Sequence, residues 1–340
     1  MSKKVTIIGA GIAGMESAGK LSEMGIEVTL LEKEKSLGGH VNNWHKVFPD
    51  YSSAKEIISK LKTEIDKNVT VLYETEIKEV INLNGKYILQ LVNHRNIESD
   101  AIIITTGFDI FDASRKEEYG FGIYENVITS ANMEEKFSLG KPIKTSRGLT
   151  PKRVAFIHCV GSRDEKVGNK YCSKVCCANA VKQAIETKQL LPEAEVYSFY
   201  MDLRMFDRYF EDLYFEAQSK YGIRFIRGRL SEACENPDGT IILKAEDTLS
   251  GKPIKMTVDM AVLMVGFTAR ANTNELTSLF GISVDTDKFI KTVDNHLNLN
   301  ITNQKGIFVA GACTGPKSIA ETLADARSAA IQTMNYLQNN

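Results

Sequence analysis

The stretch Lys3-Lys-Val-Thr-Ile-Ile-Gly9-Ala-Gly11-Ile-Ala-Gly14 decides the fold of this chain. Its first half is an apolar run that ends at a glycine, which predicts a buried parallel strand over residues 3–9. The glycines form the pattern G-x-G-x-x-G, and residues 15–24 after them predict a helix. A second strand is expected over 27–31, and it ends at Glu32. Strand, glycine turn, helix, strand and acid in this order predict a dinucleotide-binding unit.

Each residue of this pattern has an expected role. Gly9 allows the tight turn, Gly11 lets the backbone approach a pyrophosphate, and Gly14 lets helix and strand pack closely. Glu32 can accept hydrogen bonds from ribose hydroxyls. The residues expected to contact the dinucleotide here are Gly9, Gly11, Ile12, Ala13, Gly14, Glu32 and Lys33.

Further small-residue segments resemble those of flavoproteins with two dinucleotide-binding domains. A Gly-Gly pair follows Glu32 closely, the strand over 102–104 ends in Thr-Thr-Gly, and a strand from Gly306 ends in a second glycine turn. A lone Gly-Gly is more often a simple turn. The resemblance implies FAD, held additionally by Gly38, Gly39, His40, Thr105, Thr106, Gly107, Gly311, Ala312, Gly315, Pro316 and Lys317.

The same resemblance implies the domain organisation. We expect an α/β fold with a Rossmann-like FAD-binding domain formed by residues 1–112 plus 268–340. A second α/β domain, residues 113–267, is inserted into it. A helix expected over 316–337 has Pro316 at its first position and points its N-terminus at the flavin.

Four of the six cysteines lie within the nineteen residues 159–177, at the spacing C-x12-C-x3-C-C. A strand over 153–158 would place the first just past a strand end, and a helix over 171–190 would place the others on its first turns. Such crowding favours an iron–sulfur centre. Structural zinc and buried free thiols remain alternatives. The candidate metal ligands are Cys159, Cys172, Cys176 and Cys177.

The second domain lacks the glycine turn that would hold a nicotinamide dinucleotide. After the strand over 153–158 the chain continues Cys159-Val-Gly161-Ser-Arg163, where a second G-x-G-x-x-G would be needed. The first cysteine takes the place of the phosphate-binding turn. We therefore expect the nicotinamide site to be lost and the electrons to take another route.

These motifs, with several others, resemble the HdrA family, which is the FAD and iron–sulfur component of heterodisulfide reductase. The segments that carry the resemblance are Cys159-Val-Gly-Ser-Arg-Asp164, Tyr171-Cys-Ser-Lys-Val-Cys-Cys177, Gly107-Phe108, Glu118-Tyr-Gly-Phe-Gly-Ile-Tyr-Glu-Asn-Val-Ile-Thr129, Met201-Asp-Leu-Arg204, Phe225-Ile-Arg-Gly-Arg229 and Gly311-Ala-Cys-Thr-Gly-Pro-Lys317.

The resemblance implies one FAD and one [4Fe-4S] cluster, which pass electrons to partner iron–sulfur subunits. It also implies that Lys317 tunes the reduced flavin; a solvated lysine of the first helical turn is the alternative. Arg163 and Arg204 could bind an anionic group or form ion pairs. Two other function classes remain: a self-contained flavin enzyme that oxidises sulfide or reduces a disulfide, and a non-redox module with structural zinc.

Composition indicates which partners and which cellular compartment to expect. The formal net charge is −1, so the chain has no basic field for nucleic acid. No apolar run reaches the roughly 18 residues that a membrane span needs. Free thiols in a chain without an apparent export sequence indicate the cytoplasm. A homodimer is a further expectation, because aromatic residues are frequent between 199 and 215.

Overall fold

The structure is a computed structural model that describes residues 3–65, 68–83 and 85–340. The chain forms two compact units. Unit 1 contains residues 1–42, 54–109 and 268–340, and unit 2 contains residues 43–53 and 110–267. Strands β8 (Asp109–Ile110) and β17 (Phe267–Thr268) form a two-stranded sheet where the chain passes from one unit to the other.

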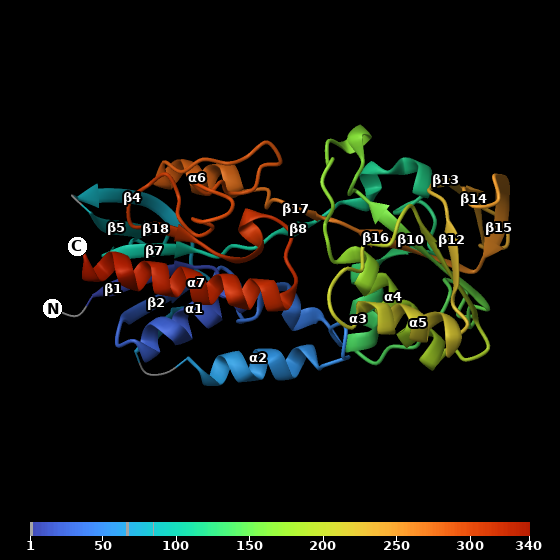
Figure 1. Cartoon of the computed structure of the whole chain (residues 1–340), viewed down its shortest axis with the longest axis horizontal. Helices are drawn as coiled ribbons and strands as arrows, with labels where there is room; N and C mark the ends of the chain where they lie inside the picture. Colours follow the sequence, from blue (N-terminus) through green and yellow to red (C-terminus); the bar gives the residue numbers. More distant parts are fainter. Residues whose placement is uncertain (1–2, 66–67, 84) are drawn as a thin grey trace. The chain divides into compact units, whose positions relative to one another are not determined.

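Unit 1 is built on a five-stranded sheet in the order β18-β7-β1-β2-β3, in which every neighbouring pair is parallel (Figure 1). Helices α1 and α7 pack side by side, and a three-stranded antiparallel sheet, β4-β5-β6, packs on the core that the parallel strands form. The elements of unit 1 are β1 Lys4–Ile8, α1 Ile12–Glu23, β2 Glu27–Leu31, η1 Gly39–Asn43 (which ends in unit 2), α2 Ala54–Thr63, β3 Val69–Leu72, β4 Ile77–Leu83, β5 Lys86–Leu91, β6 Asn96–Ser99, β7 Ala101–Ile104, α6 Thr273–Phe280, β18 Ile307–Val309, η5 Gly311–Thr314 and α7 Ile319–Gln338.

Unit 2 repeats this plan with a parallel sheet in the order β12-β11-β10-β16-β9 and an antiparallel sheet β13-β14-β15. Figure 1 labels helices α3, α4 and α5 of this unit. Its elements are η2 Ala113–Arg115, η3 Glu117–Tyr119, β9 Val127–Thr129, α3 Ser130–Ser138, β10 Arg153–Val160, η4 Glu165–Val167, α4 Cys176–Leu190, β11 Glu195–Tyr200, α5 Phe210–Ser219, β12 Arg224–Arg227, β13 Leu230–Glu235, β14 Ile241–Asp247, β15 Lys252–Val258 and β16 Met260–Val265.

The two faces of the central strand β10 explain why its sequence is continuously apolar. Val154 and Phe156 point into the core beneath the helices, whereas Ala155 and Ile157 point into the core shared with the antiparallel sheet. Successive side chains of a strand alternate between faces, so a strand that is covered on both sides needs apolar residues throughout. The observed α/β fold with parallel sheets agrees with the prediction.

Several predicted elements differ from the observed ones. The helix expected over 171–190 begins only at Cys176, and the strand expected over 153–158 extends to Val160, so Cys159 lies within β10. The helix expected from Pro316 begins at Ile319, because the Ser318 side chain caps it in a capping box with Glu321. Residues 43–53, which fall within the predicted FAD-binding domain, belong to unit 2.

Candidate functional site

The glycine turn of unit 1 has the geometry of a phosphate-binding site. Gly9 has a left-handed φ of 101°, and a Cβ at Gly14 would lie 1.9 Å from the Gly9 carbonyl oxygen. Both positions therefore require glycine for the chain to turn and for α1 to pack against β1. A Cβ at Gly11 would meet no heavy atom within 4 Å. Gly11 is also the N-cap of α1 and provides no capping side chain.

This arrangement suits the binding of a dinucleotide. The first N–H groups of a helix lack partners within the helix, and an anion near them is stabilised. Open space lies at Gly11, beside the start of α1, where Ile12 and Ala13 are the first residues. The turn can therefore receive a pyrophosphate without rearrangement of the glycines.

Other predicted FAD residues converge on the same turn. Gly38 donates its N–H to the carbonyl of Ala10 at 2.9 Å and forms a parallel bridge with Gly11. Thr105 donates its hydroxyl to the Gly9 carbonyl at 2.7 Å. A Cβ at Gly311 would lie 2.8 Å from the Cβ of Ala13. The glycine turn, the Gly-Gly pair, the end of β7 and the start of η5 thus form one site.

Glu32 lies at the end of β2 and is buried. Its carboxylate accepts the N–H of Ala10 at 2.8 Å and the N–H of Glu34 at 2.9 Å. These bonds hold the acid beside the glycine turn, and each carboxylate oxygen keeps further acceptor capacity. Lys33, in contrast, is exposed and pairs with Glu34 at 4.0 Å.

His40 and Lys317, which are also predicted to contact FAD, make contacts with other residues of unit 1. The imidazole of His40 stacks on the ring of Phe108, with centroids 4.5 Å apart, and its Nε2 lies 2.9 Å from the Phe108 carbonyl. Lys317 donates to the carbonyl of Gly311 at 3.1 Å and lies 3.5 Å from Asp325. Asp325 in turn accepts the N–H of Gly311 at 2.8 Å. Lys317 is therefore tied to the turn before α7, and tuning of a flavin by it stays a prediction. The other residues predicted to contact FAD are close in sequence to His40, Phe108 and Lys317: Gly39, Thr106, Gly107, Ala312, Gly315 and Pro316.

The four-cysteine set (Cys159, Cys172, Cys176 and Cys177) lies entirely in unit 2 and extends from the last residues of β10 to the first turn of α4. The twelve residues between its first two members fold back as a short hairpin. Arg163 donates its N–H to the Tyr171 carbonyl at 2.8 Å, and Asp164 and Asn169 exchange two backbone hydrogen bonds. The hairpin returns the chain from Cys159 to Cys172, which explains the long spacer.

Side-chain contacts anchor this hairpin within unit 2. The hydroxyls of Ser162 and Ser173 are hydrogen-bonded to each other, and Ser173 accepts the N–H of Phe267 at 2.9 Å. Tyr171 donates its hydroxyl to the Phe267 carbonyl at 2.8 Å. Lys174 has a left-handed φ of 61°. The chain cannot continue as a regular helix from Cys172 through such a residue, so α4 begins only afterwards.

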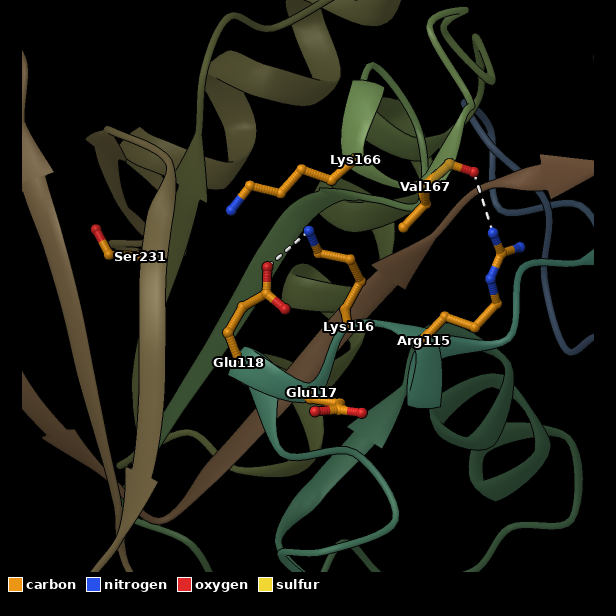
Figure 2. Close-up of a pocket in the computed structure, with 7 residues that line it drawn as sticks. All are labelled: Arg115, Lys116, Glu117, Glu118, Lys166, Val167 and Ser231. Carbon is orange, nitrogen blue, oxygen red and sulfur yellow. Dashed lines mark hydrogen bonds and ion pairs between the residues drawn. The ribbon is translucent and has the colours of Figure 1, made fainter.

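A pocket of about 420 Å³ lies beside the hairpin tip (Figure 2). Lys116 and Glu118 point toward one another in it, with Nζ and Oε1 2.7 Å apart, and Arg115 donates to the Val167 carbonyl at 3.0 Å. Lys116 also binds the carboxylate of Asp164, on the hairpin, at 2.7 Å. These ionic contacts stabilise the hairpin. The lining residues are Arg115, Lys116, Glu117, Glu118, Lys166, Val167 and Ser231.

The thiols of the four-cysteine set influence one another electrostatically. Burial raises the pKa of Cys159, against the lowering effect of the Arg163 guanidinium. Burial also raises the pKa of Cys176 well above its usual value and that of Cys177 to about 12, and negative charge on the other sulfurs acts in the same direction. Several buried thiolates would therefore need a compensating positive centre.

Four thiols are donors of the kind that soft, thiolate-bound iron prefers, but the observed arrangement of these side chains does not form a ready metal site. Cys172 is half-buried and its Sγ accepts the Lys174 N–H at 3.3 Å, while the other three sulfurs are buried. Across residues 3–65, 68–83 and 85–340, no group of three or more His, Cys, Asp or Glu side chains is arranged to hold a metal ion. The assignment of the four cysteines as ligands stays a prediction.

Sequence reasoning missed a buried ionic group in unit 2. Lys182 on α4 donates to both carboxylate oxygens of Glu134 on α3, at 2.8 and 2.7 Å, and to the carbonyl of Lys46 at 2.8 Å. His45 lies 2.9 Å from Glu186. These contacts hold residues 43–53 in unit 2. Charged residues at helical spacing, as in α4, also occur on exposed helix faces, so no sequence signal marks these residues as buried.

Comparison with known proteins shows the family to which the chain belongs. It matches the family described as pyridine nucleotide-disulphide oxidoreductase over residues 3–162 and 167–332. It is 32% identical, over 97% of its length, to the A subunit of the H(2):CoB-CoM heterodisulfide,ferredoxin reductase from Methanothermobacter thermautotrophicus. It is 31% identical, again over 97%, to the iron-sulfur A subunit of the CoB–CoM heterodisulfide reductase from Methanocaldococcus jannaschii. It spans 63% and 64% of the lengths of these relatives.

Solved structures agree on the fold. A thioredoxin reductase from T. acidophilum superposes with a TM-score of 0.67 at 17% identity, covering 99% of both chains. The enzyme from Lactococcus lactis gives a TM-score of 0.67 at 19% identity over the whole of both chains. The predicted resemblance to the HdrA family of heterodisulfide reductase is confirmed by the curated relatives. None of the described helices has the length and apolar character of a membrane span.

Proposed function

The chain belongs to the pyridine nucleotide-disulphide oxidoreductase family, and we propose that it is an electron-transfer flavoprotein subunit of a heterodisulfide-reductase-like complex. In this proposal unit 1 binds FAD and the four-cysteine set holds a [4Fe-4S] cluster. FAD supplies two-electron chemistry, whereas a cluster of this type accepts one electron at a time. The chain would thus connect a carrier of electron pairs with iron–sulfur partner subunits that take single electrons.

One observation carries the proposal: the corresponding strand-to-helix turns of the two units have different chemistry. Between β1 and α1 the turn consists of glycines and leaves open space at Gly11. Between β10 and α4 the turn is replaced by a hairpin bounded by thiols, with Cys159 in the strand and Cys176 at the helix start. This difference supports a flavin site in unit 1 and a metal centre, rather than a nicotinamide site, in unit 2.

The residues of the chain have distinct tasks in this proposal. The N–H groups at the start of α1 bind the pyrophosphate, and Glu32 accepts ribose hydroxyls while it holds the turn through Ala10. The hairpin brings Cys172 back to Cys159, and its contacts with Phe267 keep it in place. Burial of Cys159, Cys176 and Cys177 keeps water from three of the four sulfurs, which would protect a bound cluster and influence its potential.

A self-contained sulfide or disulfide enzyme has less support. Such an enzyme would need a reactive cysteine pair at the flavin, and Cys313 is the single cysteine that the sequence places in unit 1. Cys313 is buried, and burial raises its pKa to about 12. A thiol held in its protonated form is a poor nucleophile.

Anaerobic purification followed by spectroscopy and metal analysis tests the proposal. We expect bound FAD, about four irons per chain, and a broad absorption near 400 nm that dithionite bleaches. Zinc without iron would favour the structural-zinc alternative. FAD without iron, together with turnover of sulfide or a disulfide, would favour the self-contained enzyme.

The proposal extends to partners and location. The partners are iron–sulfur subunits, and a second copy of the chain is a further candidate. All six cysteines are free, which supports a reducing compartment such as the cytoplasm. Co-purification from the native source, with and without crosslinking, identifies the partners.

A further inference from the structure

We propose that Asp325 on α7 is a positioning residue of the FAD site, because it holds the turn 311–315 against the glycine turn and balances the charge of Lys317. The inference rests on the proposed function, since it concerns the cofactor site of unit 1. Asp325 lies in the second turn of α7 within unit 1, and its side chain is 8% exposed. The sequence did not mark it as a site residue.

Both carboxylate oxygens of Asp325 accept hydrogen bonds, and the donors come from separate segments. Oδ2 accepts the N–H of Gly311 at 2.8 Å, and Oδ1 accepts the side-chain amide of Asn300 at 2.7 Å. Asn300 is buried, and the same amide nitrogen donates to the carbonyl of Val309 at 3.0 Å. An asparagine could not replace Asp325 without loss, because its amide nitrogen would face one of these two donors.

Lys317 is the third partner of Asp325. Its ammonium group lies 3.5 Å from Oδ2 of Asp325, donates to the carbonyl of Gly311 at 3.1 Å and is hydrogen-bonded to the hydroxyl of Thr314. Two hydrogen bonds and one ion pair thus fix the ammonium within one turn. Burial raises the pKa of the Cys313 thiol in the same turn, where the charge of Lys317 lowers it and that of Asp325 raises it. The two charges therefore oppose one another inside the turn.

The turn that Asp325 holds packs directly on the glycine turn. Gly311 has a left-handed φ of 80°, and a Cβ on it would lie 2.8 Å from the Cβ of Ala13 at the start of α1. Ser17 on α1 donates its hydroxyl to the carbonyl of Ala326 at 3.1 Å, which joins the neighbour of Asp325 to the same helix. Loss of the Asp325 carboxylate should therefore release Gly311 while α1 and α7 stay joined.

Loss of the carboxylate and loss of the ammonium have one effect in common and one effect of opposite sign. Either loss frees the turn, so either should weaken the binding of FAD. Removal of the Asp325 charge leaves the positive charge of Lys317 unmatched, whereas removal of the Lys317 charge leaves a negative charge. Reduction adds electrons at the site, so an unmatched positive charge favours the reduced cofactor and an unmatched negative charge opposes it.

Two measurements on the full chain test this inference: titration of FAD-free protein with FAD, followed by flavin fluorescence, and an anaerobic redox titration of the bound FAD. The variants are Asp325→Asn and Lys317→Gln, each checked for folding by thermal unfolding. Asp100→Asn is the matched control. Asp100 also accepts a backbone N–H, that of Lys4 at 2.8 Å, but it lies where β1 and β7 begin, at the opposite end of these strands from the glycine turn.

We expect Asp325→Asn and Lys317→Gln each to weaken the binding of FAD at least about tenfold, and Asp100→Asn to bind FAD as the wild type does. At a fixed potential, Asp325→Asn should shift the bound cofactor toward the reduced form and Lys317→Gln toward the oxidised form. If Asp325→Asn yields no folded protein, Lys317→Gln alone provides the test, through weaker binding together with a shift toward the oxidised form.

A purely structural ion pair would respond differently. Asp325→Asn and Lys317→Gln both break the same pair, so potential shifts of the same sign, an unchanged potential, or wild-type affinity for FAD in either variant would overturn the inference. In that case FAD bound to the wild-type protein leaves the proposed function standing. A wild-type protein that binds no FAD would overturn the proposed function itself, and this inference with it.

Discussion

Lys182 donates to both carboxylate oxygens of Glu134, at 2.8 and 2.7 Å, inside unit 2, where the side chains are only 2% and 7% exposed. The pair joins α4, which begins with Cys176 and Cys177, to α3. It also accounts for the position of residues 43–53, because the same ammonium group binds the carbonyl of Lys46. The helix that carries two candidate metal ligands is therefore held by a buried ionic contact.

Lys182→Met should lower the free energy of unfolding by about 3–5 kcal/mol, because it leaves the carboxylate of Glu134 buried without its partner. Denaturant unfolding measures this change. Lys141→Met is the control: Lys141 pairs with Glu135 on the same helix as Glu134, but at 3.9 Å and with both side chains more than half exposed. Its cost should be about 0–1 kcal/mol. Equal losses of unfolding free energy in the two variants would contradict the description of Lys182 and Glu134 as a buried ion pair.

The glycines of the first turn should respond differently to alanine. Gly14→Ala places a methyl group 1.9 Å from the Gly9 carbonyl and should destabilise the protein by about 1–3 kcal/mol or more. Gly11→Ala meets no protein atom and should leave stability within about 0.5 kcal/mol of the wild type, yet reduce bound FAD because the methyl enters the cofactor space. Thermal unfolding and FAD content check both. Full FAD content in a stable Gly11→Ala protein would argue against pyrophosphate binding there.

Removal of one candidate ligand should abolish the proposed metal centre without unfolding the protein. Cys172→Ser changes a half-buried residue in the loop before α4, so we expect loss of most of the iron and little change in thermal stability of the metal-free protein. Cys234→Ser, in strand β13, is the control and should keep its iron. Iron analysis after anaerobic purification provides the measurement. A loss of iron in both variants would point to a general disturbance of unit 2.

Cys313 should resist alkylation in the native protein. Its side chain is 3% exposed, and with a pKa of about 12 only about one molecule in ten thousand carries the thiolate at pH 8. Cys234, which is half-buried, should react faster with iodoacetamide. Peptide mass spectrometry after brief labelling distinguishes the two. Rapid modification of Cys313 would support a redox thiol in unit 1.

In unit 1, the sequence predicted best those elements that are determined by residues close together in the chain. The strand over 27–31 has the predicted bounds, and the strand expected over 3–9 is observed as Lys4–Ile8. Glycine spacing and short apolar runs determine these elements directly. The convergence of Gly11, Gly38 and Gly311 is implied by the resemblance to flavoproteins with two dinucleotide-binding domains, and not by any local pattern around each glycine.

The hairpin of the four-cysteine set was not predictable from periodicity. Residues 171–175 read as a helix because apolar residues follow at helical spacing, but the contact between Ser162 and Ser173 and the left-handed Lys174 prevent it. The contact between Ser162 and Ser173 joins residues eleven positions apart in the sequence, which helical periodicity does not report. The start of α7, in contrast, could have been predicted, since Ser318 and Glu321 form the S-x-x-E pattern of a capping box.

The assignment of residues 43–53 to unit 2 has a practical consequence for fragment work. A fragment of residues 110–267 would contain all four sulfur ligands proposed for the metal but would lack the Lys46 carbonyl and the His45 imidazole, which bind Lys182 and Glu186. Truncation at residue 110 would therefore remove a partner from Lys182 and from Glu186, and also from Glu134, whose carboxylate accepts the backbone N–H of His45 at 3.0 Å. An excised version of this half of the molecule should carry residues 43–53 as a grafted peptide.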